Sequence, residues 1–342
     1  MQLHVINKLL VGGAETVASD LARNSIDKSV YTLLANSKKQ SQLAKRFGVT
    51  QKSFASFLRK YANRGTTVFS HNLQAHIAVN FVYLGMYLFF GSQKPRNVIH
   101  FDVEFVSRLW LRLFFISLKL TKPKLIFVSE FAQIKFEQQF PLSKYEWKVI
   151  HNSISDEFFD EHSEFGKVLP PAIEPITIGF IGRHAPVKRL DLFIETFFEL
   201  CELTAQVPHL CVQSDIPTEQ LHSKIRDFKP SIPSIVASKN FKHIPSTSDP
   251  REFYQQVDVV ISTSKTETFG LVALECFAHG KRFYSLDSEC FVYLFNSPKF
   301  NIKAKTASEF AREIKKDLSK EYTTPNLERF TKEKMLASYA ES

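Results

Sequence analysis

Two glutamates, Glu267 and Glu275, are separated by seven residues in the segment TETFGLVALE. An apolar run precedes this segment and a helical pattern follows Gly270, so we expect a buried strand, a polar loop and a helix opened by that glycine. The N–H groups of Phe269, Gly270 and Leu271 can then point at a phosphate, because a helix N-terminus favours anions.

Helical spacing predicts that Glu275 faces the domain interior, because it shares one face of the helix with Leu271, Leu274 and Ala278. A carboxylate held inward needs hydrogen-bond donors. The two hydroxyls of a ribose would supply them, whereas a purely structural glutamate would need an arginine or a backbone cap.

Cations follow a second glycine-bearing strand in the segment GFIGRHAPVK, which contains Arg183 and Lys188. They suit a diphosphate, since arginine grips oxygens through parallel hydrogen bonds and lysine supplies a compact charge. Capping or solvation of the loop explains the same cations equally well.

Glycine is scarce, with 11 residues in the chain, so its positions are informative. Gly12 and Gly13 stand between the first expected strand and a helix, where a backbone can approach an anion closely. A simple tight turn is equally compatible with this pair. We expect six glycines at strand-to-helix junctions, where α/β sheets bind ligands: Gly12, Gly13, Gly179, Gly182, Gly270 and Gly280.

Short apolar runs alternate with helical patterns along the whole chain, which predicts parallel sheets covered on both faces. The expected strands are residues 3–6, 30–34, 67–70, 97–101, 125–128, 148–150, 176–181, 209–212, 241–244, 257–262 and 282–285. In the second half the expected helices are 190–203, 217–227, 250–256, 270–279 and 306–318. The fold class is therefore α/β, with two Rossmann-like domains.

The pair Pro170-Pro171 interrupts any regular element and indicates an interdomain linker. The expected divisions are an N-terminal domain at 1–162, the linker at 163–175, a C-terminal domain at 176–325 and a final helix at 326–342.

The composition, with 44% hydrophobic and 23% charged residues, is that of an ordinary globular protein. The charge is uneven: residues 1–150 hold 21 Lys/Arg against 8 Asp/Glu, and residues 151–342 hold 23 against 27. This asymmetry indicates a polyanionic partner, unless it only provides a solubilising face. We expect an anionic membrane surface and no nucleic acid, because no nucleic-acid motif accompanies the charge.

Two apolar segments bear on the membrane. The run from Ile77 to Phe90 is shorter than the roughly 20 residues that span a bilayer, so we expect a buried or interfacial helix. The segment RLWLRLFFISLK mixes cations with Trp110, Phe114 and Phe115. It suits a headgroup layer, although a core helix with snorkelling cations is slightly favoured.

The four cysteines form no CxxC pair, which argues against a disulfide framework or a zinc site. The N-terminus lacks the pattern of a secretory signal. We therefore expect a cytoplasmic protein.

The TETFGLVALE segment resembles the E-x7-E motif of retaining GT-B glycosyltransferases of family four, the glycosyl transferases group 1. Three further segments are similar to motifs of this family: the glycine loop GGAE at Gly12, the linker entry VIHNS that ends at Ser153, and the donor-phosphate site GR...K at Arg183 and Lys188. The resemblance implies two Rossmann-like domains facing across a cleft, with a C-terminal helix that returns to the N-terminal domain.

The resemblance also implies roles for the site residues. Arg183 and Lys188 would neutralise the diphosphate, Glu275 would hold the ribose hydroxyls, and Glu267 would bind hydroxyls of the donor sugar. His100 is similar to a family histidine beside the donor sugar, although a satisfied core histidine is equally compatible. Asp102 is a weaker candidate for the same neighbourhood.

The implied function is transfer of a hexose-type sugar from a nucleotide-diphosphate sugar, with retention of configuration, to a saccharide acceptor. That acceptor would be lipid-linked, and the enzyme would act in surface polysaccharide assembly, peripherally at the inner face of the cell membrane. We expect no metal and no cofactor, because cations and helix-end N–H groups can stabilise the leaving diphosphate. The alternatives are a nucleotide-sugar epimerase of the same fold and a catalytically inactive nucleotide-binding scaffold.

Overall fold

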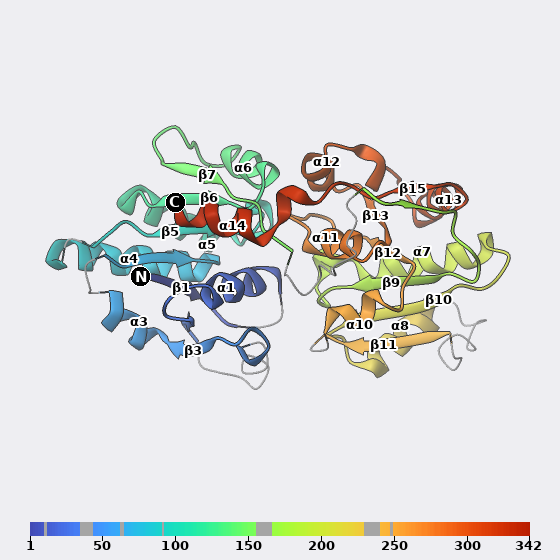
Figure 1. Ribbon diagram of the computed structural model, residues 1–342, viewed down its shortest axis with the longest axis horizontal. Helices are drawn as coiled ribbons and strands as arrows, with labels where there is room; N and C mark the ends of the chain where they lie inside the picture. Colours follow the sequence, from blue (N-terminus) through green and yellow to red (C-terminus); the bar gives the residue numbers. More distant parts are fainter. Residues whose placement is uncertain are drawn as a thin grey trace. The chain divides into compact units, whose positions relative to one another are not determined.

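A computed structural model describes residues 1–9, 12–34, 44–61, 65–90, 92–154, 166–228, 240–246 and 249–342, apart from the side chains of 88–90. The chain divides into two compact units (Figure 1). The N-terminal unit comprises Met1–Ser153 and Lys332–Ser342, and the C-terminal unit comprises Ile154–Thr331.

The N-terminal unit is built on a seven-stranded parallel sheet of order β3-β2-β1-β4-β5-β6-β7. Its strands are β1 Gln2–Ile6, β2 Ser29–Thr32, β3 Thr50–Ser53, β4 Thr67–Ser70, β5 Arg96–Ile99, β6 Lys124–Phe127 and β7 Trp147–Val149. The order of the strands reverses between β1 and β4. In such sheets a ligand binds outside the carboxyl ends of the strands, at this topological switch point.

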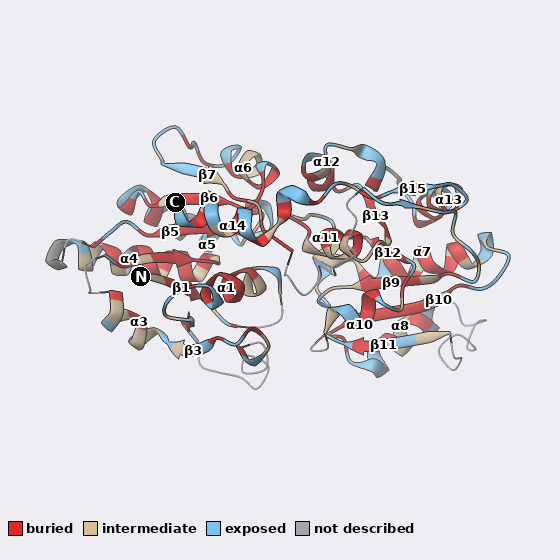
Figure 2. Cartoon of the chain, in the orientation of Figure 1, coloured by how far each residue is buried: buried red, intermediate tan, exposed pale blue. Residues whose placement is uncertain are grey.

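The helices of this unit are α1 Gly13–Arg23, α3 Phe54–Tyr61, α4 Leu73–Phe90, α5 Arg108–Thr121, α6 Glu130–Glu137 and α14 Lys332–Ala340, with a 3-10 turn η1 at Val103–Phe105. Helices α4 and α5 pack against each other. Buried residues run through the sheet and the inner faces of its helices (Figure 2), and the core there includes Ile99, Phe114 and Phe127.

The C-terminal unit repeats the plan with a six-stranded parallel sheet of order β11-β10-β9-β12-β13-β14. Its strands are β9 Thr177–Ile181, β10 His209–Ser214, β11 Phe241–Pro245, β12 Val259–Ser262, β13 Arg282–Leu286 and β14 Asn301–Ile302. A separate antiparallel pair joins β8 Val168–Leu169 to β15 Tyr322–Thr323. The switch point of the large sheet lies between β9 and β12.

The helices of the C-terminal unit are α7 Leu190–Leu203, α8 Thr218–Phe228, α10 Pro250–Tyr254, α11 Leu271–Ala278, α12 Glu289–Phe295 and α13 Ala307–Leu318. Short 3-10 turns lie at η3 Pro186–Lys188, η4 Pro298–Phe300 and η5 Glu328–Phe330.

Every strand that we expected is present within a few residues. Most of these strands are buried, and buried parallel strands are continuous apolar runs. Strand β3 was missed because its sequence, TQKS, is polar and so lacks the apolar run that predicts a strand; it forms by pairing with β2 at the edge of the sheet. The proline pair of the expected linker directly follows the short strand β8, which pairs with β15 and ends at Leu169. The described part of that linker groups with the C-terminal unit rather than lying between the two units. Residues 163–165 of that linker lie outside the described residues.

The last helix also differs from our expectation. Residues from Asn326 to Thr331 group with the C-terminal unit and contain only the short turn η5, and α14 begins at Lys332. The ammonium group of Lys332 lies 2.9 Å from the Asp20 carboxylate, and both side chains are buried. The Ser338 carbonyl accepts a hydrogen bond of 2.5 Å from Lys148. The return of the C-terminal helix to the N-terminal domain is thus confirmed.

Among the described residues, no helix combines the length and the apolar character needed to cross a membrane.

Candidate functional site

The loops that follow β9 and β12 flank the switch point of the C-terminal sheet, and hydrogen bonds tie them together. The backbone N–H of Lys265 donates to the Val187 carbonyl at 2.8 Å. The Thr263 hydroxyl donates to the Arg189 carbonyl at 2.9 Å, and Nε of Arg189 returns a bond of 2.5 Å to the Thr263 carbonyl. Two segments about 75 positions apart in sequence therefore form one rigid platform.

Lys188 and Glu267 meet on this platform. Nζ of Lys188 lies 2.5 Å from Oε1 of Glu267, and the two side chains are only 23% and 16% exposed. Partial burial strengthens such an ion pair relative to one in water. The structure thus brings together two of the residues that the sequence singled out, and an arriving phosphate would compete with Glu267 for the ammonium group.

Gly270 is required where α11 begins. Its φ of +78° lies in the left-handed region, and an added Cβ would lie 2.3 Å from Cε1 of Phe291. It is the N-cap of α11, so the helix opens where the sequence predicted. The neighbouring Phe269 is buried, and its ring packs edge-to-face with the ring of Phe330. Leu271 is half-buried.

Glu275 is half-buried on α11 and receives a hydrogen bond that we did not anticipate. The hydroxyl of Tyr254 donates to its Oε2 at 2.9 Å. Burial, and then the neighbouring carboxylate, raises the pKa of Tyr254 well above 10, so the tyrosine stays a donor. No sequence signal marked Tyr254, because it stands on a different helix 21 positions away.

Arg183 follows β9 and is exposed; within the described part of the chain its side chain makes no hydrogen bond or ion pair. The loop around it is held by the Asp215 carboxylate, which accepts from the His184 N–H at 2.6 Å. Arg189, the next cation along the chain after Lys188, anchors the loop through its bond to the Thr263 carbonyl.

Two of the six glycines do not stand at strand-to-helix junctions. Gly179 lies inside β9, where an added Cβ would lie 2.5 Å from the Phe253 ring, so it serves helix-to-sheet packing. Gly280 follows α11 with a φ of +61° and leads from that helix into β13.

Gly12 and Gly13 belong to the N-terminal unit. Gly12 is the N-cap of α1, and its carbonyl accepts from the Thr16 N–H at 2.9 Å. Its φ of 177° is an extended conformation open to any residue. The pair begins a helix as expected, beside the β1/β4 switch point of its own sheet.

His100 follows β5 in the same unit and is half-buried. Its Nε2 lies 3.2 Å from Nδ1 of His71, and Nε2 of His71 lies 3.0 Å from Nδ1 of His4. Burial lowers the pKa of His100 and of His4 to about 3, so both rings are neutral. Asp102, the weaker candidate, accepts from the Glu104 N–H at 2.9 Å and so caps η1.

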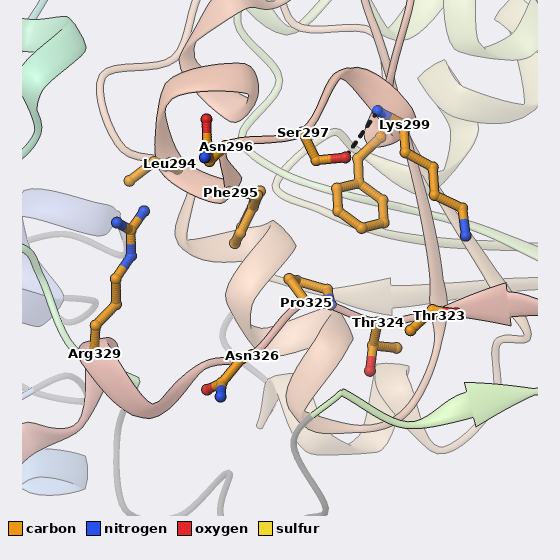
Figure 3. Close-up of a pocket in the computed structure, with 11 residues that line it drawn as sticks. Leu294, Phe295, Asn296, Ser297, Lys299, Thr323, Thr324, Pro325, Asn326 and Arg329 are labelled. Carbon is orange, nitrogen blue, oxygen red and sulfur yellow. Dashed lines mark hydrogen bonds between the residues drawn. The ribbon is translucent and has the colours of Figure 1, made fainter.

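A separate pocket of the C-terminal unit lies between the end of α12, η4 and the chain after β15 (Figure 3). None of its lining residues belongs to the loops after β9 and β12. The side chains of Arg329 and Lys299 extend in different directions (Figure 3), so their charges do not converge on one ligand. Within the described residues, no group of three or more His, Cys, Asp and Glu side chains is placed to hold a metal ion.

Two Rossmann-like domains with parallel sheets define the GT-B fold, and solved structures share it across the whole chain. Anabaena Alr3699/HepE in complex with UDP and glucose has a TM-score of 0.77 and 15% identity, and the match covers 100% of this chain and 98% of that one. A glycosyltransferase from Rickettsia africae ESF-5 has a TM-score of 0.69 and 15% identity, with 99% and 97% covered. The apo form of the lipopolysaccharide outer core galactosyltransferase WaaB has a TM-score of 0.64 and 15% identity, with 100% and 98% covered.

The family model for glycosyl transferases group 1 matches residues 163–335, just over half of the chain. The chain therefore belongs to the glycosyl transferases group 1 family. No curated protein matches the sequence significantly.

Proposed function

We propose that this glycosyltransferase moves a hexose-type sugar from a nucleotide-diphosphate sugar to a saccharide acceptor with retention of configuration. The observation that carries the proposal is the ion pair of Lys188 and Glu267 at the β9/β12 switch point, whose Nζ and Oε1 atoms lie 2.5 Å apart. A cation for the diphosphate and a carboxylate for sugar hydroxyls stand there side by side. The similar HepE structure is described as a complex with UDP and glucose.

In this proposal the donor spans the two loops of the C-terminal platform. Lys188 and the exposed Arg183 neutralise the diphosphate, and the helix-end N–H groups around Gly270 add to that field. Glu275 accepts hydrogen bonds from the ribose hydroxyls through the carboxylate that Tyr254 fixes in place. Glu267 leaves Lys188 to accept hydroxyls of the donor sugar.

The N-terminal unit contributes His100 and the glycine pair Gly12-Gly13. His100 lies beside the donor sugar, and the N-terminus of α1 behind Gly12 presents N–H groups to an anionic part of the ligand. Both stand at carboxyl ends of strands in their own sheet, which is where α/β sheets bind ligands.

The reaction breaks the bond between the anomeric carbon and the diphosphate, so negative charge develops on the leaving group. Lys188, held by its ion pair with Glu267, and the helix-end N–H groups are in place before the reaction, which is the arrangement that stabilises such charge most. We propose that this set performs the task without a metal ion or a cofactor.

The acceptor is proposed to be lipid-linked, and the enzyme to act at the inner face of the cell membrane in surface polysaccharide assembly. Helix α5 supports this, because Leu109, Ile116 and Leu120 are 68%, 49% and 57% exposed. Three exposed cations stand among them, at Arg108, Arg112 and Lys119. Apolar groups interleaved with cations suit an anionic headgroup layer.

The structure corrects part of that membrane face. Phe114 is fully buried in the core and Phe115 packs on Phe140 at a ring distance of 4.7 Å, so neither reaches a bilayer. Trp110 is 42% exposed and remains available.

The test is a screen of the purified chain against a panel of nucleotide sugars, with and without saccharide acceptors. Release of nucleoside diphosphate that depends on Lys188 and Glu267, with a retained anomeric configuration in the product, supports the proposal. Interconversion of the donor without an acceptor would favour an epimerase instead. Tight nucleotide binding without any turnover would favour an inactive scaffold.

A further inference from the structure

Three histidines of the N-terminal unit form a continuous hydrogen-bonded chain, which we call the histidine chain: His4, His71 and His100. His4 lies within β1, His71 directly follows β4, and His100 directly follows β5. These strands are neighbours in the sheet, in the order β1-β4-β5. The two links measure 3.0 Å and 3.2 Å between ring nitrogens. The histidine chain therefore runs from the middle of the buried strand β1 to the carboxyl edge of the sheet, where His100 lies.

The three rings cannot choose their tautomers independently. Burial lowers the pKa of His4 and His100 to about 3 and that of His71 well below 6.5, so each ring is neutral. A neutral imidazole carries one N–H donor and one bare acceptor nitrogen. Because His71 uses both nitrogens within the chain, it must donate one bond and accept the other. Two arrangements of the protons remain. Either His4 donates to His71 and His71 donates to His100, or His100 donates to His71 and His71 donates to His4.

The buried end of the histidine chain selects between these arrangements. Nε2 of His4 is buried and has no hydrogen-bond partner among the residues that the structure describes. In one arrangement that nitrogen carries a proton, which leaves a buried N–H without an acceptor. Buried N–H groups without partners are rarer in proteins than buried acceptors without them. The other arrangement places the proton of His4 on Nδ1, from which His4 donates to His71 and His71 donates to His100.

We propose that His4 and His71 are positioning residues that hold His100 in its Nδ1–H tautomer, so that His100 offers a hydrogen-bond donor to the donor sugar. The part that concerns the sugar rests on the proposed function. In that tautomer Nε2 of His100 accepts from His71, and the ring is fixed in direction as well as in protonation. A hydroxyl oxygen of the sugar then meets a donor whose orientation is set before binding.

The first test reads the tautomer directly in the unmodified protein. The full chain is labelled with ¹⁵N-histidine, and two-bond ¹H–¹⁵N correlation spectra distinguish Nδ1–H from Nε2–H rings. The signal of His100 is assigned by its loss in His100→Gln. We expect the Nδ1–H form. If the spectra show His100 in the Nε2–H form, the proposal is overturned. Because the tautomer is read in the wild-type protein, a folding defect of a core variant cannot explain that result.

The second test changes the far end of the histidine chain. His4→Asn keeps an amide donor near the position of Nδ1, whereas His4→Leu removes the donor. We expect the asparagine variant to retain the tautomer of His100. We expect the leucine variant to show a mixture of tautomers and a kcat for donor turnover that is about fivefold lower, the effect of losing one neutral hydrogen bond.

The outcomes separate this inference from the proposed function. Nucleotide affinity, which depends on the C-terminal unit, should be equal in both His4 variants, and circular dichroism with the dispersion of the histidine spectra serves as the check that the N-terminal unit is folded. An unchanged tautomer and an unchanged kcat in folded His4→Leu would overturn the inference even if transfer occurs. Wild-type protein without any donor turnover would overturn the proposed function, while the spectra still decide the tautomer.

Discussion

Replacement of Glu275 by glutamine tests the donor site most sharply. The carboxylate of Glu275 has two oxygens, and Oε2 accepts from the Tyr254 hydroxyl at 2.9 Å. Because the raised pKa of Tyr254 keeps it protonated, that oxygen stays engaged. A glutamine has a single oxygen, which Tyr254 retains. The ribose would then face an amide N–H₂ group, which cannot accept a bond from a hydroxyl.

The size of the effect follows from the hydrogen bonds that are lost. A hydrogen bond to a charged group contributes about 1.5–3 kcal/mol. Each 1.4 kcal/mol corresponds to roughly a factor of ten in affinity. Glu275→Gln should therefore weaken the binding of a nucleoside diphosphate by about tenfold to a hundredfold.

Isothermal titration calorimetry of the full chain with nucleoside diphosphates measures this loss. Glu313→Gln is the matched control, because it makes the same change in a half-exposed pair with Lys316 on α13 and should leave the affinity unchanged. Tyr254→Phe should cost less than Glu275→Gln, because it keeps the carboxylate that would bind the ribose and removes only the hydrogen bond that orients it. An unchanged Kd in folded Glu275→Gln would refute the assignment of the ribose to this carboxylate.

Three further predictions concern catalysis, folding and the membrane. Arg183→Ala and Lys188→Ala should each lower turnover by on the order of a hundredfold in steady-state assays, and full rates in both variants would contradict the assignment of these cations to the diphosphate. Turnover of the wild type should survive a chelator. Inactivation by the chelator that added magnesium reverses would contradict a donor site without a metal. Gly270→Ala should lower the melting temperature by several degrees through backbone strain and the clash with the Phe291 ring. Gly182→Ala should not, because an added Cβ would lie 3.6 Å from the Phe180 ring, an ordinary contact distance; equal melting temperatures would refute this reasoning. The chain should co-sediment with anionic vesicles at low salt and less at high salt, and Trp110→Ala should weaken that binding; equal binding to neutral vesicles would refute the electrostatic part.

The sequence was sufficient for the parts of the molecule that local patterns determine. The strands at β4, β9 and β12 were predicted because a strand buried on both faces must be an apolar run. The start of α11 was predicted because a glycine between a polar loop and a helical pattern marks a helix end. These features depend on residues within a few positions of one another, so one stretch of sequence contains all the information.

Only the tertiary structure decided which side chains meet. Lys188 and Glu267 are 79 positions apart, Tyr254 and Glu275 are 21 apart, and His4 and His71 are 67 apart. Their contacts depend on the order of strands in each sheet, which places the ends of β9 and β12, or of β1 and β4, side by side. That order is set by the packing of the whole sheet and its helices, and no local pattern reports it. The residue types that could do the chemistry were visible in the sequence, but their hydrogen-bond partners were not.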